Sequence, residues 1–241
     1  MTQKILAKLM SFAGSNKLGL FKIAIASSFL VIVPQGQVKA ALLTVANNSF
    51  ETPVITAPSG IISSTGSVGG WTFSGAQPQG FANPVAAHNA GGSWYGSSPG
   101  IIPDGNQIAW SNGGTISQTL SGTLQTNTVY TLRAFVGNRL GVNFPGYNIG
   151  LYAGGNLLAS NSGVTPADGT FAPVTVSYTS GISVTPGQAL EIRLTSLSGS
   201  NAQTNFDNIT LDAASIPEPS AILGLLGFGL LGIASKLRQK Q

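Results

Sequence analysis

Short runs of alternating apolar and polar residues fill the middle of the chain and predict β-strands. In the run 128–136, for example, Tyr130, Leu132 and Ala134 share one face of an extended strand. The clearest strands are expected at 115–120, 128–136, 147–152, 173–179 and 189–196. Shorter strands are expected at 42–45, 70–73, 107–110, 156–160 and 205–211. No helical period appears between residues 41 and 217, so the pattern predicts an all-β domain of two packed antiparallel sheets.

The composition agrees with this class and removes several kinds of site. The chain has 32 Gly and 13 Pro, and only 7% of its residues are charged, which is typical of strands joined by many turns. It has no Cys, which excludes a disulfide scaffold, thiol catalysis and zinc held by cysteine. Its single His excludes a metal site built from several histidines.

Residues 1–40 have the pattern of a secretory signal peptide. A basic stretch with Lys4, Lys8, Lys17 and Lys22 precedes an apolar run at 23–33, and small residues surround Ala40. This run is shorter than the roughly 20 residues that span a bilayer. We therefore expect a signal helix that is removed, rather than an anchor or a buried helix.

The C-terminus combines three features in order. Pro217, Glu218 and Pro219 lie in a linker at 214–220, an apolar segment follows at 221–235, and a basic tail occupies 236–241. The apolar segment predicts a short transmembrane helix, because its glycines are tolerated in lipid and permit close helix packing. The basic tail is expected on the cytoplasmic side, which places Pro217 to Pro219 outside.

This tripartite tail resembles the PEP-CTERM sorting signal of Gram-negative bacteria that make extracellular polysaccharide. The resemblance implies that an exosortase, a membrane peptidase, processes the protein near Pro217–Pro219 after export. It also implies a protein that is anchored transiently in the inner membrane and then reaches the cell surface or the extracellular matrix. An ordinary C-terminal anchor is the alternative.

Charge is distributed unevenly along the chain and argues against nucleic acid as a partner. The whole chain has a net charge of +4, but the basic residues cluster at the two ends. Between residues 41 and 217 three arginines, Arg133, Arg139 and Arg193, face six acidic residues. A domain without Lys and without clustered Arg has little with which to neutralise phosphates.

Several segments of the domain resemble the galactose-binding-like jelly roll of many carbohydrate-binding modules. The resemblance rests on Asn47–Glu51 at the first strand, Gly70–Trp71, Ser117–Leu120 and Phe206–Leu211 as the last strand, and it covers residues 41–213. It implies that the first and last strands lie together and that a structural Ca²⁺ sits near them. Asn48, Glu51 and Asp207 would be its ligands, since Ca²⁺ prefers oxygen ligands. The alternative is that these side chains only bond nearby backbone.

Candidate ligand-binding residues gather in a glycine-rich segment before the strand expected at 107–110. Trp94 and Tyr95 are expected to offer rings on which sugars stack, and His88, Asn89 and Asp104 to offer hydrogen-bonding groups. Asn138, Arg139 and Asn143 are further candidates, whereas Trp71 and Trp110 are expected in the core.

No catalytic constellation stands out in the sequence. A glycosidase needs two carboxylates about one bond, and Asp104, Asp168 and Glu191 are scattered along the chain. A serine hydrolase needs a base, and His88 lacks a suitable serine motif nearby. The sequence therefore predicts a non-enzymatic surface or matrix protein that binds polysaccharide. A passive matrix component without a ligand site is the alternative, and a glycan hydrolase is a more remote one.

Overall fold

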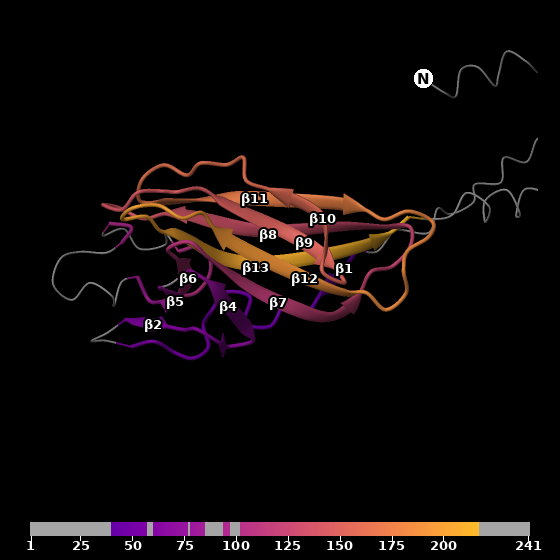
Figure 1. Ribbon diagram of the computed structural model, residues 1–241, viewed down its shortest axis with the longest axis horizontal. Helices are drawn as coiled ribbons and strands as arrows, with labels where there is room; N and C mark the ends of the chain where they lie inside the picture. Colours follow the sequence, from indigo (N-terminus) through magenta and orange to yellow (C-terminus); the bar gives the residue numbers. More distant parts are fainter. Residues whose placement is uncertain (1–39, 57–59, 77, 85–93, 97–101, 217–241) are drawn as a thin grey trace, which may run out of the picture. The chain divides into compact units, whose positions relative to one another are not determined.

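The computed structural model describes residues 40–56, 60–76, 78–84, 94–96 and 102–216. They form thirteen β-strands in two antiparallel sheets, which confirms the predicted all-β sandwich (Figure 1). The regions expected to form the signal helix and the transmembrane helix lie outside the described residues. Within the described part, no helix is long and apolar enough to cross a membrane.

The first sheet has seven strands and the second has six. In the first sheet the order is β11–β8–β13–β6–β5–β2, and β1 also pairs with β13. Its strands are β1 (Ala41–Leu43), β2 (Ile61–Ser63), β5 (Gln79–Ala82), β6 (Ile108–Ser111), β8 (Thr128–Asn138), β11 (Thr170–Thr179) and β13 (Thr204–Ser215). In the second sheet the order is β10–β9–β12–β7–β4–β3. Its strands are β3 (Ser67–Val68), β4 (Trp71–Gly75), β7 (Gly114–Thr123), β9 (Tyr147–Ala153), β10 (Asn156–Asn161) and β12 (Ala189–Ser196).

The core lies between the two sheets and is built by the strict alternation seen in the sequence. On β8, Tyr130, Leu132, Ala134 and Val136 all join the same buried cluster. On β12, Leu190, Ile192 and Leu194 do so from the other sheet. These alternating apolar positions face inward, which fixes the register of both strands because a slip of one residue would turn the whole set to solvent.

β13 changes its second partner partway along its length. Its ladder with β8 shifts between Asp207 and Thr210, where Asn208 has a φ of 49°. Before this bulge β13 pairs with β6, and after it with β1, through Leu211 and Leu43. The first and last strands thus lie together, as the jelly-roll resemblance implies.

Two buried glutamines hold the turn and loop that follow β1. Gln107 accepts a hydrogen bond from Ile55 N at 2.5 Å and donates to the carbonyls of Phe50 and Pro53. Gln118 accepts from Ala46 N at 2.8 Å and donates to the carbonyls of Ala46 and Gly70. The loop has few regular strand bonds of its own, so these amides supply the partners that its buried backbone groups require.

We expect Gln107→Leu to lower the free energy of unfolding by about 2–4 kcal/mol, because three backbone groups lose their partners in the interior. Urea unfolding followed by tryptophan fluorescence measures this change. Gln125→Leu is the matched control, since Gln125 is exposed and its side chain bonds only Thr123. An equal effect of both substitutions would contradict the role of Gln107.

Candidate functional site

A second apolar cluster lies on the outer side of the seven-stranded sheet. On β6, Ala109 faces the main core, so Ile108 and Trp110 on either side face outward. They pack with Ala82, Trp94 and Tyr95 in what is called here the outer cluster. Trp94 and Tyr95 are only 2% and 3% exposed. The rings that were expected to stand open to sugars are therefore buried against the sheet.

A polar group on β13 and another just after β8 contact the aromatic residues of this cluster. The Tyr95 hydroxyl donates a hydrogen bond to Asn205 Oδ1 at 2.6 Å, and its ring lies 4.5 Å from that of Phe171. Burial raises the pKa of Tyr95 well above its ordinary value, so the hydroxyl remains a donor. The Arg139 guanidinium lies 3.9 Å from the centre of the Trp94 ring, and burial lowers the pKa of Arg139. These contacts make the cluster a mixed aromatic and polar site.

A glycine and an unpaired side-chain donor distinguish the outer cluster. Gly137 of β8 leaves room for the rings, because a Cβ there would lie 2.3 Å from the Tyr95 hydroxyl and 2.6 Å from Phe171. The Trp110 Nε1 donor is buried without a hydrogen-bond partner among the described residues. A buried unpaired donor is uncommon, and it is a group that a ligand can satisfy.

Asp207 is the carboxyl at the centre of this side of the sheet. It lies two residues after Asn205 on β13 and is completely buried. Its Oδ2 accepts from Asp104 N at 2.9 Å, and its Oδ1 accepts from Asn208 N at 2.7 Å. Burial raises the pKa of Asp207 to about 8, an effect that these two N–H groups oppose and that the carboxylates of Asp104 and Glu51 reinforce. At neutral pH the side chain is therefore mostly the neutral acid.

The turn that covers Asp207 is held by residues after β1. Glu51 Oε1 accepts from Asn106 N at 2.7 Å and from Gln107 N at 2.6 Å. Ser49 donates to the Asp104 carboxylate at 2.5 Å. Gly105 has a φ of +68° and meets Glu51 so closely that a Cβ would lie 2.4 Å from its Oε1. Glu51 thus acts as the acceptor that ends this turn.

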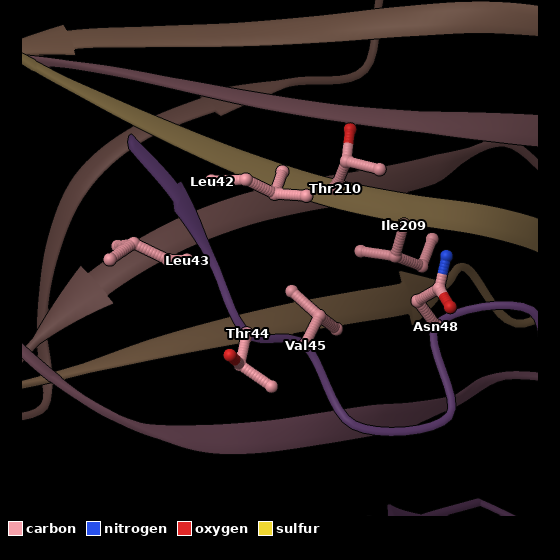
Figure 2. Close-up of a pocket in the computed structure, with 7 residues that line it drawn as sticks. All are labelled: Leu42, Leu43, Thr44, Val45, Asn48, Ile209 and Thr210. Carbon is pink, nitrogen blue, oxygen red and sulfur yellow. The ribbon is translucent and has the colours of Figure 1, made fainter. Parts of the chain in front are cut away.

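The three predicted calcium ligands do not converge on one point. Glu51 and Asp207 bind the same turn, but their oxygens accept hydrogen bonds from its backbone. The Asn48 side chain instead lines a groove, and the Asn48 carbonyl accepts from Ile209 N at 2.9 Å (Figure 2). Across the described ranges, no three His, Cys, Asp or Glu side chains are grouped as metal ligands. As arranged, these residues do not supply the six to eight oxygens of a calcium site.

The groove lies where β13 leaves β6 and meets β1. Its volume is about 250 Å³, and it is lined by Leu42, Leu43, Thr44, Val45, Asn48, Ile209 and Thr210 (Figure 2). The bulge at Asn208 produces this groove. Between the part of β13 that pairs with β6 and the part that pairs with β1, no described strand pairs with that edge of β13. Its lining is mainly apolar, with one amide at the rim, and it lacks the carboxyl and the aromatic rings of the outer cluster.

The remaining predicted residues are distributed as follows. His88 and Asn89 lie outside the described residues. Asp104 is exposed above Asp207. Asp168 accepts a hydrogen bond from Asn138 at the end of β8, and Glu191 pairs with Arg193 on β12 of the other sheet. The three carboxylates considered for a hydrolase therefore lie in separate parts of the sandwich.

Sequence reasoning missed Asn205 as a site residue. Gln203, just before β13, alternates with Asn205 and Asp207 on that strand, and all three are buried. Alternating polar residues that frame the core residue Phe206 indicate a polar site on the outer face of a strand. The identity of the partner, Tyr95, had no comparable signal because it comes from a segment 110 residues away.

The two antiparallel sheets define an all-β sandwich domain. Within this class of domain, the chain belongs to the HpiC1-like family, described as HpiC1 cyclase, whose model matches residues 41–212. The PEP-CTERM protein-sorting motif matches residues 215–239, which confirms the predicted sorting signal at Pro217–Pro219 and its implied recognition by exosortase.

Solved structures give the same assignment for the domain. The Stig cyclase Fisc from Fischerella sp. TAU, in complex with (3Z)-3-(1-methyl-2-pyrrolidinylidene)-3H-indole, is 26% identical, with a TM-score of 0.62. The match covers 74% of this chain and 100% of that one. A cyclase from Fischerella sp. TAU in complex with 4-(1H-indol-3-yl)butan-2-one is 26% identical over 73% of this chain and 100% of that chain, with a TM-score of 0.61.

A carbohydrate-binding domain is a more distant structural neighbour. The CBM22-1 xylan-binding domain of Paenibacillus barcinonensis Xyn10C is 13% identical over 63% of this chain and 90% of that chain, with a TM-score of 0.42. Among curated protein sequences, none matches this chain.

The raised pKa of Asp207 predicts a specific dependence of stability on pH. The folded state keeps the proton up to about pH 8, whereas an unfolded Asp loses it near pH 4. The contribution of protonated Asp207 to the free energy of unfolding is complete below about pH 4. It is lost as the pH rises from there through about 8, with a slope approaching about 1.4 kcal/mol per pH unit. Urea unfolding at several pH values measures this slope.

Asp207→Asn should abolish the slope, and Asp212→Asn, on the same strand, should retain it. A slope that persists in Asp207→Asn would contradict its assignment to Asp207.

Calcium binding near Glu51 and Asp207 stays a prediction, with a direct measurement. Bound Ca²⁺ would favour the ionised Asp207, so calcium would raise the melting temperature and remove the pH slope described above. Thermal unfolding with calcium and with EDTA tests this at pH 6 and pH 8. Identical curves under all conditions would count against a structural calcium ion.

Proposed function

We propose that the protein is an exported surface or matrix component whose HpiC1-like sandwich binds neutral polysaccharide and does not convert it. The single observation that carries this proposal is the sorting motif at 215–239, since the signal belongs to proteins delivered outside cells that make polysaccharide. The domain suits such a partner because few of its residues are charged and Ser, Thr and Asn are abundant.

In this proposal the ligand binds at the exposed turn of Asp104, over Asp207 and the outer cluster, whose buried groups would have to open to it. A neutral carboxylic acid both donates and accepts hydrogen bonds, as a sugar hydroxyl does. Asp104, whose N–H bonds Asp207, is exposed, and its carboxylate adds an acceptor beside Ser49. Trp110 Nε1 adds a donor that has no partner among the described residues. The aromatic rings behind these groups supply the apolar surface against which a ring-shaped ligand packs.

The test is thermal unfolding of the full chain in detergent with a panel of soluble neutral polysaccharides. A ligand that binds the native state raises the melting temperature, by an amount equivalent to about 2.7 kcal/mol at 100 times its dissociation constant. We expect Asp104→Asn to reduce the shift and Asp168→Asn to leave it unchanged. Asp168 is the matched control because it is also an exposed Asp but lies by Asn138.

The absence of a shift with any polysaccharide would overturn this proposal. A chain that is exported and processed normally but binds nothing would be a passive structural component of the matrix. Loss of the shift in Asp168→Asn as well as Asp104→Asn would place the binding surface elsewhere on the domain.

A second candidate function is acid-assisted conversion of a small ring-containing molecule. Asp207 favours it, because a carboxylic acid that holds its proton near neutral pH beside aromatic side chains has the properties of a general acid. The HpiC1-like family and the indole complexes of its 26% identical structural relatives support the same idea.

Incubation with indole-bearing compounds, followed by liquid chromatography and mass spectrometry, tests the second candidate. The expected product of an isomerising cyclase has the same mass and a different retention time. Asp207→Asn should abolish conversion and preserve the ligand-induced melting shift. Binding of polysaccharide but not indoles, with no conversion, would reject this candidate and support the first.

A further inference from the structure

Both ends of the domain leave it at the same end of the sandwich. Ala41 at the start of β1 pairs with Ala213 near the end of β13, and Ser215 pairs with Thr128 (Figure 1). The loops between β7 and β8 and between β11 and β12 lie at this end too, since Thr123 pairs with Ala189 and Thr179 pairs with Val129. We call the set formed by residues 41–42, 124–127, 180–188 and 214–216 the exit end.

Ile182 is the most exposed large apolar side chain of the described residues, at 87%, and it lies on the exit end. Two others share this end: Leu42 is 68% exposed and Ile216 is 42% exposed. Nothing within the sandwich uses the Ile182 side chain. An exposed apolar side chain either contacts something outside the folded domain or has no role. The position of Ile182 on the domain distinguishes these two cases.

The loop that carries Ile182 is fastened to the end of β13. Ser180 donates to Gln125 O at 2.6 Å and accepts from Thr128 N at 2.9 Å through its hydroxyl. Asn127 N donates to Gly181 O at 2.9 Å, and Asn127 O accepts from Ile216 N at 2.5 Å. A single residue, Asn127, thus joins the base of the Ile182 loop to the last described residue. Ile182 is held beside the point where the chain continues to Pro217.

The exit end is uncharged throughout. Residues 41–42, 124–127, 180–188 and 214–216 contain no Asp, Glu, Lys or Arg. The nearest charged residues along the chain are Lys39, Asp212 and Glu218, followed by Glu191; of these, Asp212 pairs with Arg133 and Glu191 with Arg193. An uncharged surface can enter a lipid headgroup region without the cost of removing water from ions.

The length of chain after Ile216 limits how far this end can be from a membrane. Only residues 217–220 separate it from the apolar segment that begins at Ala221. Four extended residues reach about 14 Å. With the segment in the bilayer, the exit end therefore lies within about 14 Å of the start of that segment, a reach about twice the roughly 5–7 Å of headgroup layer on each side of the hydrocarbon.

We propose that the exit end rests on the lipid bilayer before processing, with Ile182 inserted among the headgroups. This inference depends on the membrane attachment that the sorting motif implies. It adds a lipid-contact site on the folded domain itself, at a loop outside the sorting motif.

The chain has no cysteine, so a single introduced cysteine can report on each position. Full-length Ile182→Cys, labelled with the polarity-sensitive fluorophore NBD, is reconstituted in vesicles of phosphatidylethanolamine and phosphatidylglycerol. We expect blue-shifted emission and loss of about half of it with lipid spin-labelled near the headgroup, as for a side chain at interfacial depth. Leu197→Cys is the matched control: an apolar residue, 48% exposed, at the opposite end, where its N–H bonds Gly146 O.

The outcomes separate this proposal from the attachment on which it depends. Quenching at position 182 but not at 197 supports it. Protein that floats with the vesicles but shows no quenching at 182 overturns the contact and leaves the attachment intact. Protein that does not float overturns both. A decrease of NBD emission at position 182 in vesicles without spin-labelled lipid would indicate a second copy of the chain on the exit end. Equal quenching at positions 182 and 197 would indicate general adsorption of the protein to the vesicles. Either result also overturns the proposed lipid contact.

A second variant tests Ile182 without a label at that position. NBD on Ser183→Cys should show the same quenching, and adding Ile182→Asp should abolish it while leaving the melting temperature unchanged, since Ile182 makes no core contact. Quenching at 183 that is unaffected by Ile182→Asp would overturn the role of Ile182.

Discussion

The bulge of β13 at Asn208 is the constraint on which much of the domain depends. β13 is central in the seven-stranded sheet and pairs with β8 along most of its length. The bulge lets it bond β6 on one half and β1 on the other, so one strand joins three partners. Without β13, the β11–β8 and β6–β5–β2 parts of the sheet would have no common strand. The same bulge opens the groove beside Asn48 and follows directly after Asp207.

Asp207 combines two demands that oppose each other. Its burial disfavours a charge, yet it accepts hydrogen bonds from Asp104 N and Asn208 N, which favour one. Burial is the larger effect, so the neutral acid prevails near neutral pH. A neutral acid beside aromatic rings suits either of two uses: recognition of an uncharged ligand or delivery of a proton. The fold accommodates both because the site lies outside the main core.

The fold was largely predictable because its long strands alternate strongly. All ten expected strands correspond to observed ones, with ends that differ by a few residues. β2, β3 and β5 were missed, since they have two to four residues and lie among Gly and Ser. In such short segments no period can be read, and pairing with a neighbour decides the structure.

The candidate site was only partly predictable. Asp104, Trp94 and Tyr95 were predicted as ligand-binding residues and Asp207 as a calcium ligand, but Trp94 and Tyr95 were expected to be exposed because glycines surround them. In the structure they cover the outer face of β6 instead. This could not be read from the sequence, because it depends on β5, β6 and β13 being neighbours in one sheet. The order of strands in a sheet is set by contacts between segments far apart in the chain.

The pairing of β1 with β13 also determines when the domain can form. A chain that crosses a membrane from its N-terminus delivers β1 first and β13 last. Until β13 arrives, β8 and β6 lack the strand that joins them, and most of the sheet's long-range contacts cannot be made. The sorting motif begins at residue 215, at the end of that same strand. Completion of the fold and arrival of the motif are therefore nearly simultaneous, so the processing peptidase meets a domain that has only just become able to fold.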